Sequence, residues 1–515
     1  MSRRAGGRAA RKAIREAPLA DDVKPVTPGM QGGRYKPLTD TDVAKINEAV
    51  MEILETIGMS QATPSAIEYL TGAGCTLTPE GRLLFPRALV EDTIANAARN
   101  ITLHGQDPKH DMQLSDSRLY FGTAGAAVHV VDVDTREYAE SKLHDLYQIG
   151  RIVDMCEHIH FFQRPLVARD MIEPADLDFN TCYASVMATT KHIGTSWVDP
   201  EHVKQSVEML HMIAGSEEKW RERPFVSMSC TFVVPPLRFA EDSIRCMEVG
   251  VKAGMPVLLL SAGQAGATSP AAVAGSVAQS VAECLAGLVY VNAIVPGHPA
   301  VFGTWPFVSD LRTGAMSGGS GEQAILAAAV GQMGRFYDLP CGTAAGMTDA
   351  KLPDAQSGYE KGYTDTLAGH CGVNLVYESA GMHGSLMGCC YESYIIDNDM
   401  LGAINRTVRG IEVNDETLSV EAMRSVCLGG PNHFLGHDQT INLMQREYIY
   451  PDVGDRTSPK EWKEQGSTDM LERAKVRVKS ILDNHYPNHI DPAIDAAIRE
   501  KFNVCLPEET MRPAE

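Results

Sequence analysis

The feature of this sequence that most constrains its fold is a repeat of short apolar runs, each followed by a segment long enough to form a helix. Seven runs begin about 30 to 45 residues apart, which is the length of a strand, a helix and their connections. The runs are His158–Phe162, His192–Trp197, Phe225–Phe232, Pro256–Ser261, Ala300–Trp305, Leu339–Ala344 and Val373–Tyr377. With an eighth strand near Phe121 or later, they predict an α/β fold, a (β/α)8 TIM barrel. An open doubly wound sheet stays as the alternative, although no G-x-G-x-x-G motif follows a first strand.

The segments around this repeat suggest four parts. We expect a basic Gly/Pro-rich N-terminal arm over 1–38, a helical cap over 39–117, the barrel with a leading β-hairpin over 118–420, and a C-terminal helical region over 421–515. Thr39–Ile57 has the apolar spacing of an amphipathic helix, and Leu83–Phe85 is a candidate strand. The hairpin would begin at Arg118 and turn at Asp134 and Thr135.

Charge limits the possible partners. The 46 basic and 66 acidic side chains give a formal charge of −20, which argues against a nucleic-acid partner. Only Ser2–Arg15 departs from this balance, with six basic residues and no acidic one. We interpret this stretch as a strap that lies on an acidic surface of the body or of a neighbouring subunit, and a mitochondrial presequence is the alternative.

One stretch, Ala271–Val295, is long enough to cross a membrane. Glu283 at its centre, Gln279 and many Ala and Gly residues instead favour a buried helix in the outer ring of the barrel. The twelve cysteines include no C-x-x-C pair, and no secretory signal is visible near the start. We therefore expect a cytoplasmic protein with free thiols and no membrane partner.

Candidate site residues lie at the carboxyl ends of the expected strands, because reactive groups of such barrels are carried there. Aromatic residues recur at these ends, although aromatics make up only 6% of the chain. They are Phe162, Trp197, Phe232, Trp305, Phe307 and Tyr377. Aromatic faces attract a quaternary ammonium by about 0.5 to 2 kcal/mol each, but the same rings could simply fill the top of the barrel.

Polar groups occupy the same ends: Asp310, Asp349, Glu378 and His383, with Lys351 two residues beyond Asp349. Loop capping and ion pairing are the structural alternative for each of them. The sequence contains no H-E-x-x-H, G-x-S-x-G or P-loop motif. We therefore predict no tightly bound metal and no nucleotide or hydrolase chemistry.

Six stretches resemble the trimethylamine methyltransferase superfamily, the corrinoid-dependent methylamine methyltransferases. They are GGRYKPLT, GATSPAAVAG, AECLAG, PGHPAVFG, TAAGMTDAKLPDAQSGYEK and RGIEVNDETLS. The resemblance implies a (β/α)8 barrel that moves a methyl group from an N-methylated amine to the cobalt of a corrinoid. The resemblance also implies that the corrinoid (cobalamin) is a co-substrate on a separate carrier protein, and the D-x-H-x-x-G pattern of corrinoid carriers is absent from this chain.

Founding members of that family carry pyrrolysine in the barrel, whereas all 515 positions here are ordinary residues. The corresponding region lies around Thr348–Gln356. Pyrrolysine-free relatives resemble this chain in being linked to quaternary amines, glycine betaine above all. The nitrogen of such a substrate is already cationic and leaves as a neutral tertiary amine, so the enzyme needs no acid, base or metal. The resemblance thus implies methyl transfer from a betaine, first of all glycine betaine, giving dimethylglycine.

A site for a betaine needs ring faces around the trimethylammonium and donors for the carboxylate, with the reacting atoms held in line. From strand-end placement we predict a cage of Trp197, Phe232, Trp305 and Phe307. We predict that His383 and the backbone amides of Gly381–Gly384 donate hydrogen bonds to the carboxylate. We predict that Glu378 and Asp349 act as orienting or electrostatic groups.

Two other functions stay open. Lys351 could form a Schiff base in a lyase or aldolase on the same barrel, but such a lysine must be desolvated or lie near another cation, and here two acids are close in sequence. A non-catalytic protein that binds quaternary amines is the second alternative. We expect a homo-oligomer, assembled through the N-terminal arm and the C-terminal helices.

Overall fold

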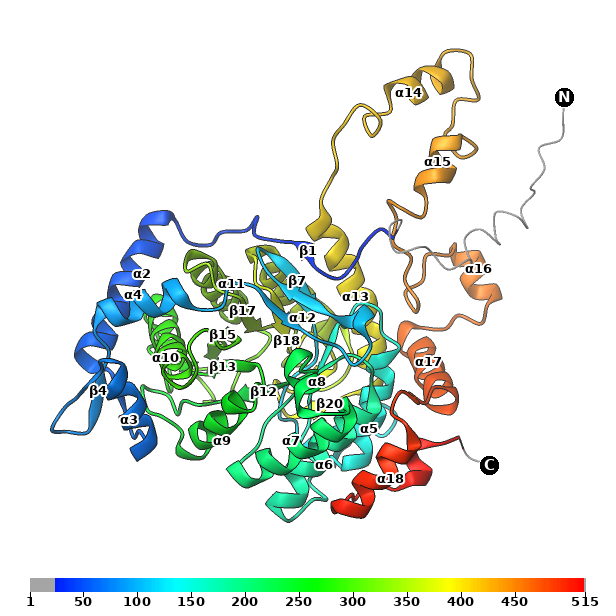
Figure 1. The fold of residues 1–515 in the computed structure, drawn as a ribbon. Coiled ribbons are helices and arrows are strands. Elements are labelled where there is room, and N and C mark those ends of the chain that lie inside the picture. Colours follow the sequence, from blue (N-terminus) through cyan, green and yellow to red (C-terminus); the bar gives the residue numbers. More distant parts are fainter. Residues whose placement is uncertain (1–23, 514–515) are drawn as a thin grey trace.

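The computed structural model describes residues 24–513, and its centre is a ring of eight strands (Figure 1). Around the ring these are β7 (Arg118–Phe121), β18 (Leu375–Tyr377), β17 (Cys341–Ala344), β15 (Ala300–Thr304), β13 (Val257–Ser261), β12 (Val226–Cys230), β11 (His192–Thr195) and β10 (Phe161–Gln163). Each pairs with its neighbour in parallel. Gly122 bridges Phe161 in parallel, and the His160 amide donates to the Phe121 carbonyl at 2.6 Å. The ring is therefore closed, which confirms the barrel and excludes the open sheet.

All seven runs identified in the sequence overlap a barrel strand, and the eighth strand is β7, near Phe121 as one of the two expected positions had it. The predicted hairpin is only partly correct. Strands β8 (His129–Val131) and β9 (Tyr138–Glu140) pair antiparallel around Asp134 and Thr135, as expected. Arg118–Phe121, however, belongs to the barrel, because Tyr120 and Phe121 pair with β18.

One helix follows each barrel strand and covers the ring from outside. In chain order these are α5 (Leu143–Asp154), α6 (Pro174–Ala188), α7 (Pro200–Ala214), α9 (Glu241–Lys252), α10 (Val273–Ile294), α11 (Gly321–Phe336), α12 (Ala355–Cys371) and α13 (Tyr391–Arg409). The short α8 (Glu217–Glu222) is an addition after α7. Further strand pieces lie in the loops: β14 (Gln264–Ala265), β16 (Phe307–Val308), β19 (Met382–His383) and β20 (Gly388–Cys389).

Helix α10 is the segment whose length and composition would fit a membrane span, and 83% of its most apolar window is buried inside the protein. Within the chain described, it is the one helix that meets this criterion. Glu283 lies in its middle, where it accepts hydrogen bonds from the Leu237 amide at 2.8 Å and the Ser261 hydroxyl at 2.5 Å. Burial raises the pKa of Glu283. The helix thus packs in the core, as its small residues and central carboxylate predict.

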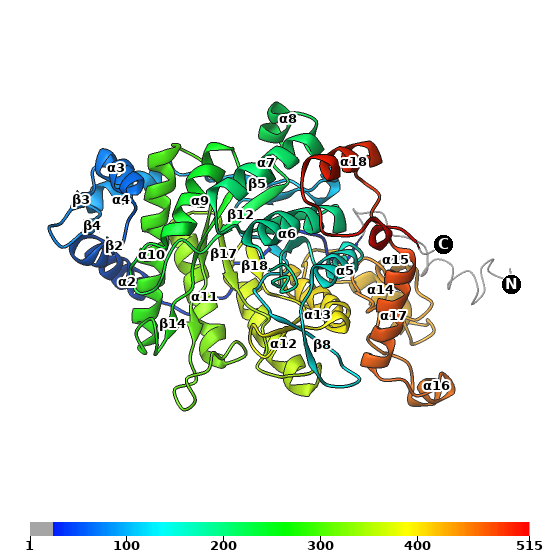
Figure 2. The ribbon, with the colours of Figure 1, turned by 90° about the horizontal axis from the view of Figure 1, so that it is seen from below.

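The N-terminal cap packs against α10 on one side of the barrel (Figure 2). The predicted helix over Thr39–Ile57 is present: α2 (Asp40–Glu52) begins at a capping box between Thr39 and Asp42 and continues as a π-helical turn. The remaining cap elements are β2 (Met59–Ser60), α3 (Pro64–Ala73), β3 (Thr76–Leu77), β4 (Arg82–Leu84), α4 (Arg87–Asn96), β5 (Ile101–Leu103) and β6 (Met112–Leu114). Strand β4 confirms the strand expected around Leu83–Phe85.

The two ends of the chain lie on the barrel in different ways. Of the predicted N-terminal arm, β1 (Met30–Gln31) pairs antiparallel with β7, while the basic stretch Ser2–Arg15 lies outside the described residues. Helices α17 (Met470–Asn484) and α18 (Pro492–Lys501) pack on the barrel side opposite the cap (Figure 2). Between α13 and α17 the chain leaves the body as a projecting segment, residues 411–447, with α14 (Val420–Cys427) and α15 (Asp438–Leu443); α16 (Pro459–Glu464) follows.

Candidate active site at the carboxyl end of the barrel

Strand register decides which side chains fill the barrel, because successive residues of a strand point to opposite faces. Three strand glycines leave room for large interior side chains. A Cβ atom would meet Gln163 at Gly194, Leu258 at Gly303, and Tyr377 at Gly342. Glycine in a strand interior often marks such a close approach. The alternation of glycines with large residues thus places Gln163 and Tyr377 inside the ring.

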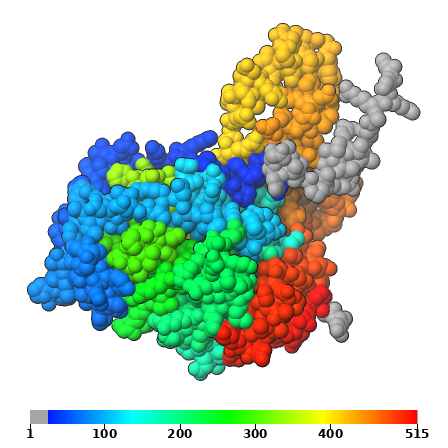
Figure 3. Space-filling view, in the orientation of Figure 1, coloured from blue at the N-terminus to red at the C-terminus, as the bar shows by residue number. Residues whose placement is uncertain are grey.

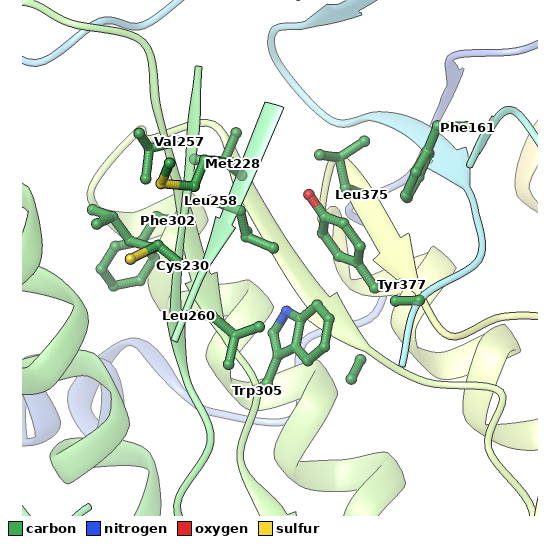
Figure 4. Packing of buried hydrophobic residues seen from close by; sticks show 14 of the residues in the cluster. Phe161, Met228, Cys230, Val257, Leu258, Leu260, Phe302, Trp305, Leu375 and Tyr377 are labelled. Atoms are coloured by element: carbon green, nitrogen blue, oxygen red, sulfur yellow. The ribbon is translucent and has the colours of Figure 1, made fainter. Parts of the chain in front are cut away.

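Three aromatic rings meet in this interior (Figure 4). The Tyr377 ring centroid lies 5.0 Å from that of Phe161 and 5.0 Å from that of Trp305, with interplanar angles of 70° and 45°. All three side chains are buried, and the Trp305 Nε1–H has no hydrogen-bond partner among the described residues. Such an unpaired donor inside a protein is costly. The rings therefore form an aromatic cluster in which the indole N–H of Trp305 has no acceptor among the described residues.

Glu378 directly follows Tyr377 and has an unusual conformation and environment. Its φ of 63° is in the left-handed region, which non-glycine residues adopt at a cost and which is concentrated at functional sites. The side chain is buried, and no donor within residues 24–513 reaches its Oε2. Burial raises the pKa of Glu378 to about 8, so the carboxyl group is largely protonated at neutral pH.

The turn after Glu378 is held by a buried ion pair. Asp397 on α13 accepts a hydrogen bond from Lys361 Nζ at 2.6 Å and one from the Gly381 amide at 2.8 Å. The Lys361 and Asp397 side chains are both buried. The Gly381 amide, predicted as a carboxylate donor, thus already has an acceptor in the chain, and the Gly384 amide donates to the Ala350 carbonyl.

His383 lies on β19, six positions after Tyr377 in the sequence. Its Nε2 is 2.7 Å from the Ser393 hydroxyl, and its Nδ1 is buried without a partner in the part of the chain that the structure describes. Burial lowers the pKa of His383 well below its usual value, so the ring is neutral. One ring nitrogen is therefore held by α13 and the other is unpaired.

Asp349 and Lys351 line a different part of the mouth. Asp349 accepts hydrogen bonds from the Ser317 hydroxyl at 2.6 Å, the Gly318 amide at 2.8 Å and the Ser385 hydroxyl at 2.7 Å. Its carboxylate thus fastens two loops together. Lys351 is exposed and donates to the Asp349 carbonyl at 2.5 Å. Both residues border a cavity of about 490 Å³ at the mouth.

The other predicted cage residues are buried but engaged elsewhere. Trp197 Nε1 donates to the Ser206 hydroxyl on α7 at 2.8 Å. The Phe232 ring fills the space over Gly287 of α10, outside the ring of strands. Phe307 lies on β16, which pairs with β14 above the barrel. The structure brings Trp305 together with Tyr377, and it does not bring Trp197 or Phe232 to the aromatic cluster.

Two interior residues, Phe161 and Gln163, are absent from the predicted site. The sequence HFFQRP suggested Phe162 as the strand-end aromatic, yet Phe162 packs toward Gly150 on α5. The signal that separates the two phenylalanines is strand parity: Phe161 and Gln163 share a face, and Phe161 pairs with Gly122, at the end of β7.

Two further features concern a possible metal ion and a possible protein partner. In residues 24–513 no group of three or more His, Cys, Asp or Glu side chains is arranged to hold a metal ion. At the mouth, loops after five barrel strands expose large apolar side chains, which are Ile172, Val198, Val234, Leu311 and Met387. We refer to these five exposed side chains as the apolar rim.

Comparisons with known proteins cover nearly the whole chain. The family model described as trimethylamine methyltransferase (MTTB) matches residues 4–503. Trimethylamine methyltransferase MttB of Desulfitobacterium hafniense strain DCB-2 is 30% identical over 90% of this chain and 92% of its own length. Glycine betaine methyltransferase of strain Y51 is 29% identical over 90% and 96%, and MttB of Methanosarcina thermophila is 30% identical over 90% and 96%. Relatives with two different substrates are therefore equally similar.

Proposed function

The chain belongs to the trimethylamine methyltransferase (MTTB) family, and from that membership we propose that it transfers a methyl group from a quaternary amine to a corrinoid. The substrate is a betaine, first of all glycine betaine, and the product is dimethylglycine. The acceptor is Co(I) of a corrinoid on a separate carrier protein. The twelve cysteines are all free thiols, in keeping with a cytoplasmic enzyme.

The observation that carries this proposal is the aromatic cluster of Phe161, Trp305 and Tyr377, in a chain without pyrrolysine. Ring faces attract a trimethylammonium group through their quadrupoles. Attack of Co(I) on the methyl carbon breaks the C–N bond, and the electron pair stays on nitrogen, which becomes a neutral amine. Since this leaving group needs no proton, rings that orient the substrate suffice where a tertiary amine would require activation.

The neutral state of Glu378 suits this chemistry. Positive charge leaves nitrogen as the methyl group moves, so a strong anion beside the substrate would stabilise the ground state more than the transition state. Because burial keeps the Glu378 carboxyl protonated near neutral pH, it does not pair strongly with the cation, and its O–H can donate to the carboxylate of a betaine. We therefore propose Glu378 as an orienting group.

His383 is the second proposed donor, through its unpaired Nδ1. Asp349 and Gly381 are proposed as supports of the mouth loops, in line with their hydrogen bonds to Ser385 and Asp397. Trp305 is the cage residue to which we give most weight. The remaining predicted cage residues, which are Trp197, Phe232 and Phe307, would then contribute by packing the loops that follow their own strands.

The apolar rim around the mouth is proposed as the carrier's docking surface. A corrinoid is much larger than a betaine, so its cobalt must be brought to the mouth by the carrier. Leu311, 70% exposed, and its neighbour Arg312 lie on one of the loops that would make this contact. Apolar and arginine side chains together are typical of protein interfaces.

A substrate panel tests the proposal directly. Glycine betaine, proline betaine, carnitine and trimethylamine are each incubated with the enzyme and free Co(I)alamin, and methyl-Co(III) is followed spectroscopically. We expect the fastest methylation with glycine betaine and none with trimethylamine. Faster turnover of trimethylamine than of every quaternary amine would contradict the proposal. Saturable betaine binding without any methyl transfer would instead support a non-catalytic binding protein.

The lyase alternative has less support. A Schiff-base lysine must lose its proton near neutral pH, which requires desolvation or a neighbouring cation, but the Lys351 side chain is exposed. Its ammonium group donates a hydrogen bond to the backbone carbonyl of Asp349, which is not a cation.

A further inference from the structure

The amino-terminal end of the barrel contains a cavity that is separate from the mouth. Its volume is about 560 Å³, which is within the range of sites for small molecules. Ile159 and His160 directly precede β10, and Lys191 directly precedes β11, so these lining residues lie where the strands begin. The proposed active site lies where the strands end. The cavity is therefore a second candidate site at the opposite end of the barrel.

Two segments that are far apart from these strand starts in the sequence also line the cavity. In Figure 3 the dark blue N-terminal arm lies beside the light blue chain that carries β6 and β7, and β1 of the arm pairs with β7. Lys24 and Pro28 come from the arm, and Lys109 and Met112 come from the second segment. The walls are thus brought together by the fold and not by one loop.

One part of the wall is apolar. Met112, Cys156 and Ile159 are buried, and Met155, at the end of α5, is 43% exposed. Methionine side chains adapt easily to the shape of a bound molecule. Small-molecule sites are typically lined by apolar side chains, with a few polar groups that fix the orientation of the ligand. These four side chains therefore suit the hydrocarbon part of a ligand.

Lys191 adds a positive charge to the wall. Its side chain is buried, and its Nζ donates hydrogen bonds to the carbonyls of Val153 at 2.6 Å, Cys156 at 2.5 Å and Ile159. Burial lowers the pKa of Lys191 to about 8, so the ammonium group is still charged at neutral pH. Within residues 24–513 no carboxylate forms an ion pair with it, and a buried charge without an ionic partner is costly. An anion in the cavity would compensate this charge.

Two histidine rings of the wall have no hydrogen-bond acceptor. The Phe121 amide donates to His160 Nδ1 at 2.9 Å, so the neutral ring of His160 carries its hydrogen on Nε2. His160 is 5% exposed, and no acceptor among the described residues bonds to this N–H, which is costly inside a protein. The ring of His110 likewise makes no hydrogen bond within residues 24–513. Burial lowers the pKa of both rings, so both are neutral and each can donate an N–H to a ligand.

The carboxylates of the wall already have partners within the chain. Their partners are Arg223 for Asp111, His485 for Asp154 and Lys24 for Glu157, each at 2.8 Å. These three carboxylates favour a ligand with a single negative charge, because a dianion such as phosphate would be repelled more strongly. The wall thus suits a monoanion that accepts hydrogen bonds and has an apolar part.

We propose that this cavity binds a small organic carboxylate with an apolar body. The carboxylate accepts hydrogen bonds from His160 Nε2–H and from the ring of His110, and its charge compensates that of Lys191. The hydrocarbon part lies against Met112 and Met155. The described lining residues include no Phe, Tyr or Trp, so the cavity offers no ring faces to a quaternary ammonium group. A betaine is therefore not the ligand of this cavity.

Calorimetric titration of the full chain with sodium hexanoate tests the proposal. Hexanamide, which has nearly the same shape and no charge, and inorganic phosphate are the comparison ligands. We expect hexanoate to bind with a dissociation constant below about 1 mM, and hexanamide to bind at least about tenfold more weakly. Phosphate should not bind measurably. Undetectable binding of hexanoate, or equal binding of hexanoate and hexanamide, would overturn the proposal.

Substitutions of Met155 test the sign of the charge. Met155→Asp should weaken hexanoate binding by about tenfold or more, because it adds an anion to the wall, whereas Met155→Lys should not weaken it. Met423→Asp is the matched control, since Met423 is 51% exposed and lies on α14, away from the cavity. All three variants should keep the circular dichroism of the wild type. Equal losses in Met155→Asp and Met155→Lys, or in Met423→Asp, would refute binding of an anion in this cavity.

Carbon-13 NMR of the methionine methyl groups then locates the ligand. Hexanoate should shift the signals of Met112 and Met155, assigned by substitution to Leu, and leave those of Met316 and Met387 beside the mouth unchanged. Shifts at Met316 and Met387 alone would show that hexanoate enters the site proposed for the betaine. That result would overturn the second site and leave the proposed methyl transfer intact.

Discussion

The barrel and the projecting segment contain the same kinds of apolar side chain, but the barrel buries them and the segment exposes them. Leu258 and Phe302 are buried by neighbouring strands and helices of their own chain, whereas Leu428 and Leu435 are open to solvent. Hydrophobic burial stabilises whichever state removes the surface from water. In the barrel that state is the folded chain, whereas no described element packs closely on α14 or α15 of the segment. Stability should therefore respond to substitutions in the barrel far more than to substitutions in the segment.

The largest expected contrast is in stability. Phe302→Ala should lower the free energy of unfolding by about 3–5 kcal/mol, because it leaves a cavity between β15 and the outer helices. Leu435→Ala should change it by less than about 0.5 kcal/mol, since the side chain is exposed. Urea unfolding of both variants checks this. Similar losses for the two would remove the contrast between the regions.

The next effect concerns pH and Glu378 inside the barrel. Its pKa of about 8 in the folded protein lies above that of an unfolded glutamate, so the folded state keeps the proton that the unfolded state releases. Stability should therefore fall as pH rises from about 5 to 8, by up to a few kcal/mol, and stay level below that range. Glu378→Gln should flatten this profile.

Thermal melting at several pH values, with Glu412→Gln in the projecting segment as the control, measures the difference. A wild-type profile that is parallel to that of Glu378→Gln would contradict the burial of an ionisable carboxyl group.

A smaller effect is expected on catalysis. Trp305→Ala should lower kcat/KM for glycine betaine by about 10- to 100-fold, because a ring face and the substrate's orientation are both lost. Trp305→Phe keeps a ring face and should lose only a few-fold. Methylation of free Co(I)alamin measures both. Equal activity of Trp305→Ala and wild type would remove the aromatic cluster from the site.

The smallest effect is expected at Lys351. Lys351→Met should leave kcat/KM within about twofold, since the ammonium group is exposed and contacts only the Asp349 carbonyl. Borohydride with a carbonyl substrate should give no adduct on the wild-type protein. A stable adduct at Lys351, found by peptide mass analysis, would instead support the lyase.

The sequence allowed the barrel to be predicted more fully than its site. Apolar runs and their spacing located seven strands, because a strand buried on both faces is a continuous apolar run. The sequence predicted Arg118–Phe121 both as the start of a hairpin and, near Phe121, as a candidate eighth strand. It could not decide between them, since the pairing of β7 with β18 joins residues more than 250 positions apart. The choice between Phe161 and Phe162 depended on which side of β10 faces the axis, and a run of buried residues does not show this.

Local sequence determined where strands and helices form, that α10 belongs to a core, and that the chain lacks pyrrolysine. The lack of pyrrolysine is read directly from the residues. Strands and helices are predictable because periodicity and capping act over a few neighbouring positions. Only the tertiary structure decided that Trp305 and Tyr377 meet, that Glu378 is desolvated, and that no other element within residues 24–513 packs closely on α14 or α15. Burial and ring contacts are long-range properties, since they depend on which distant segments come together when the ring of strands closes.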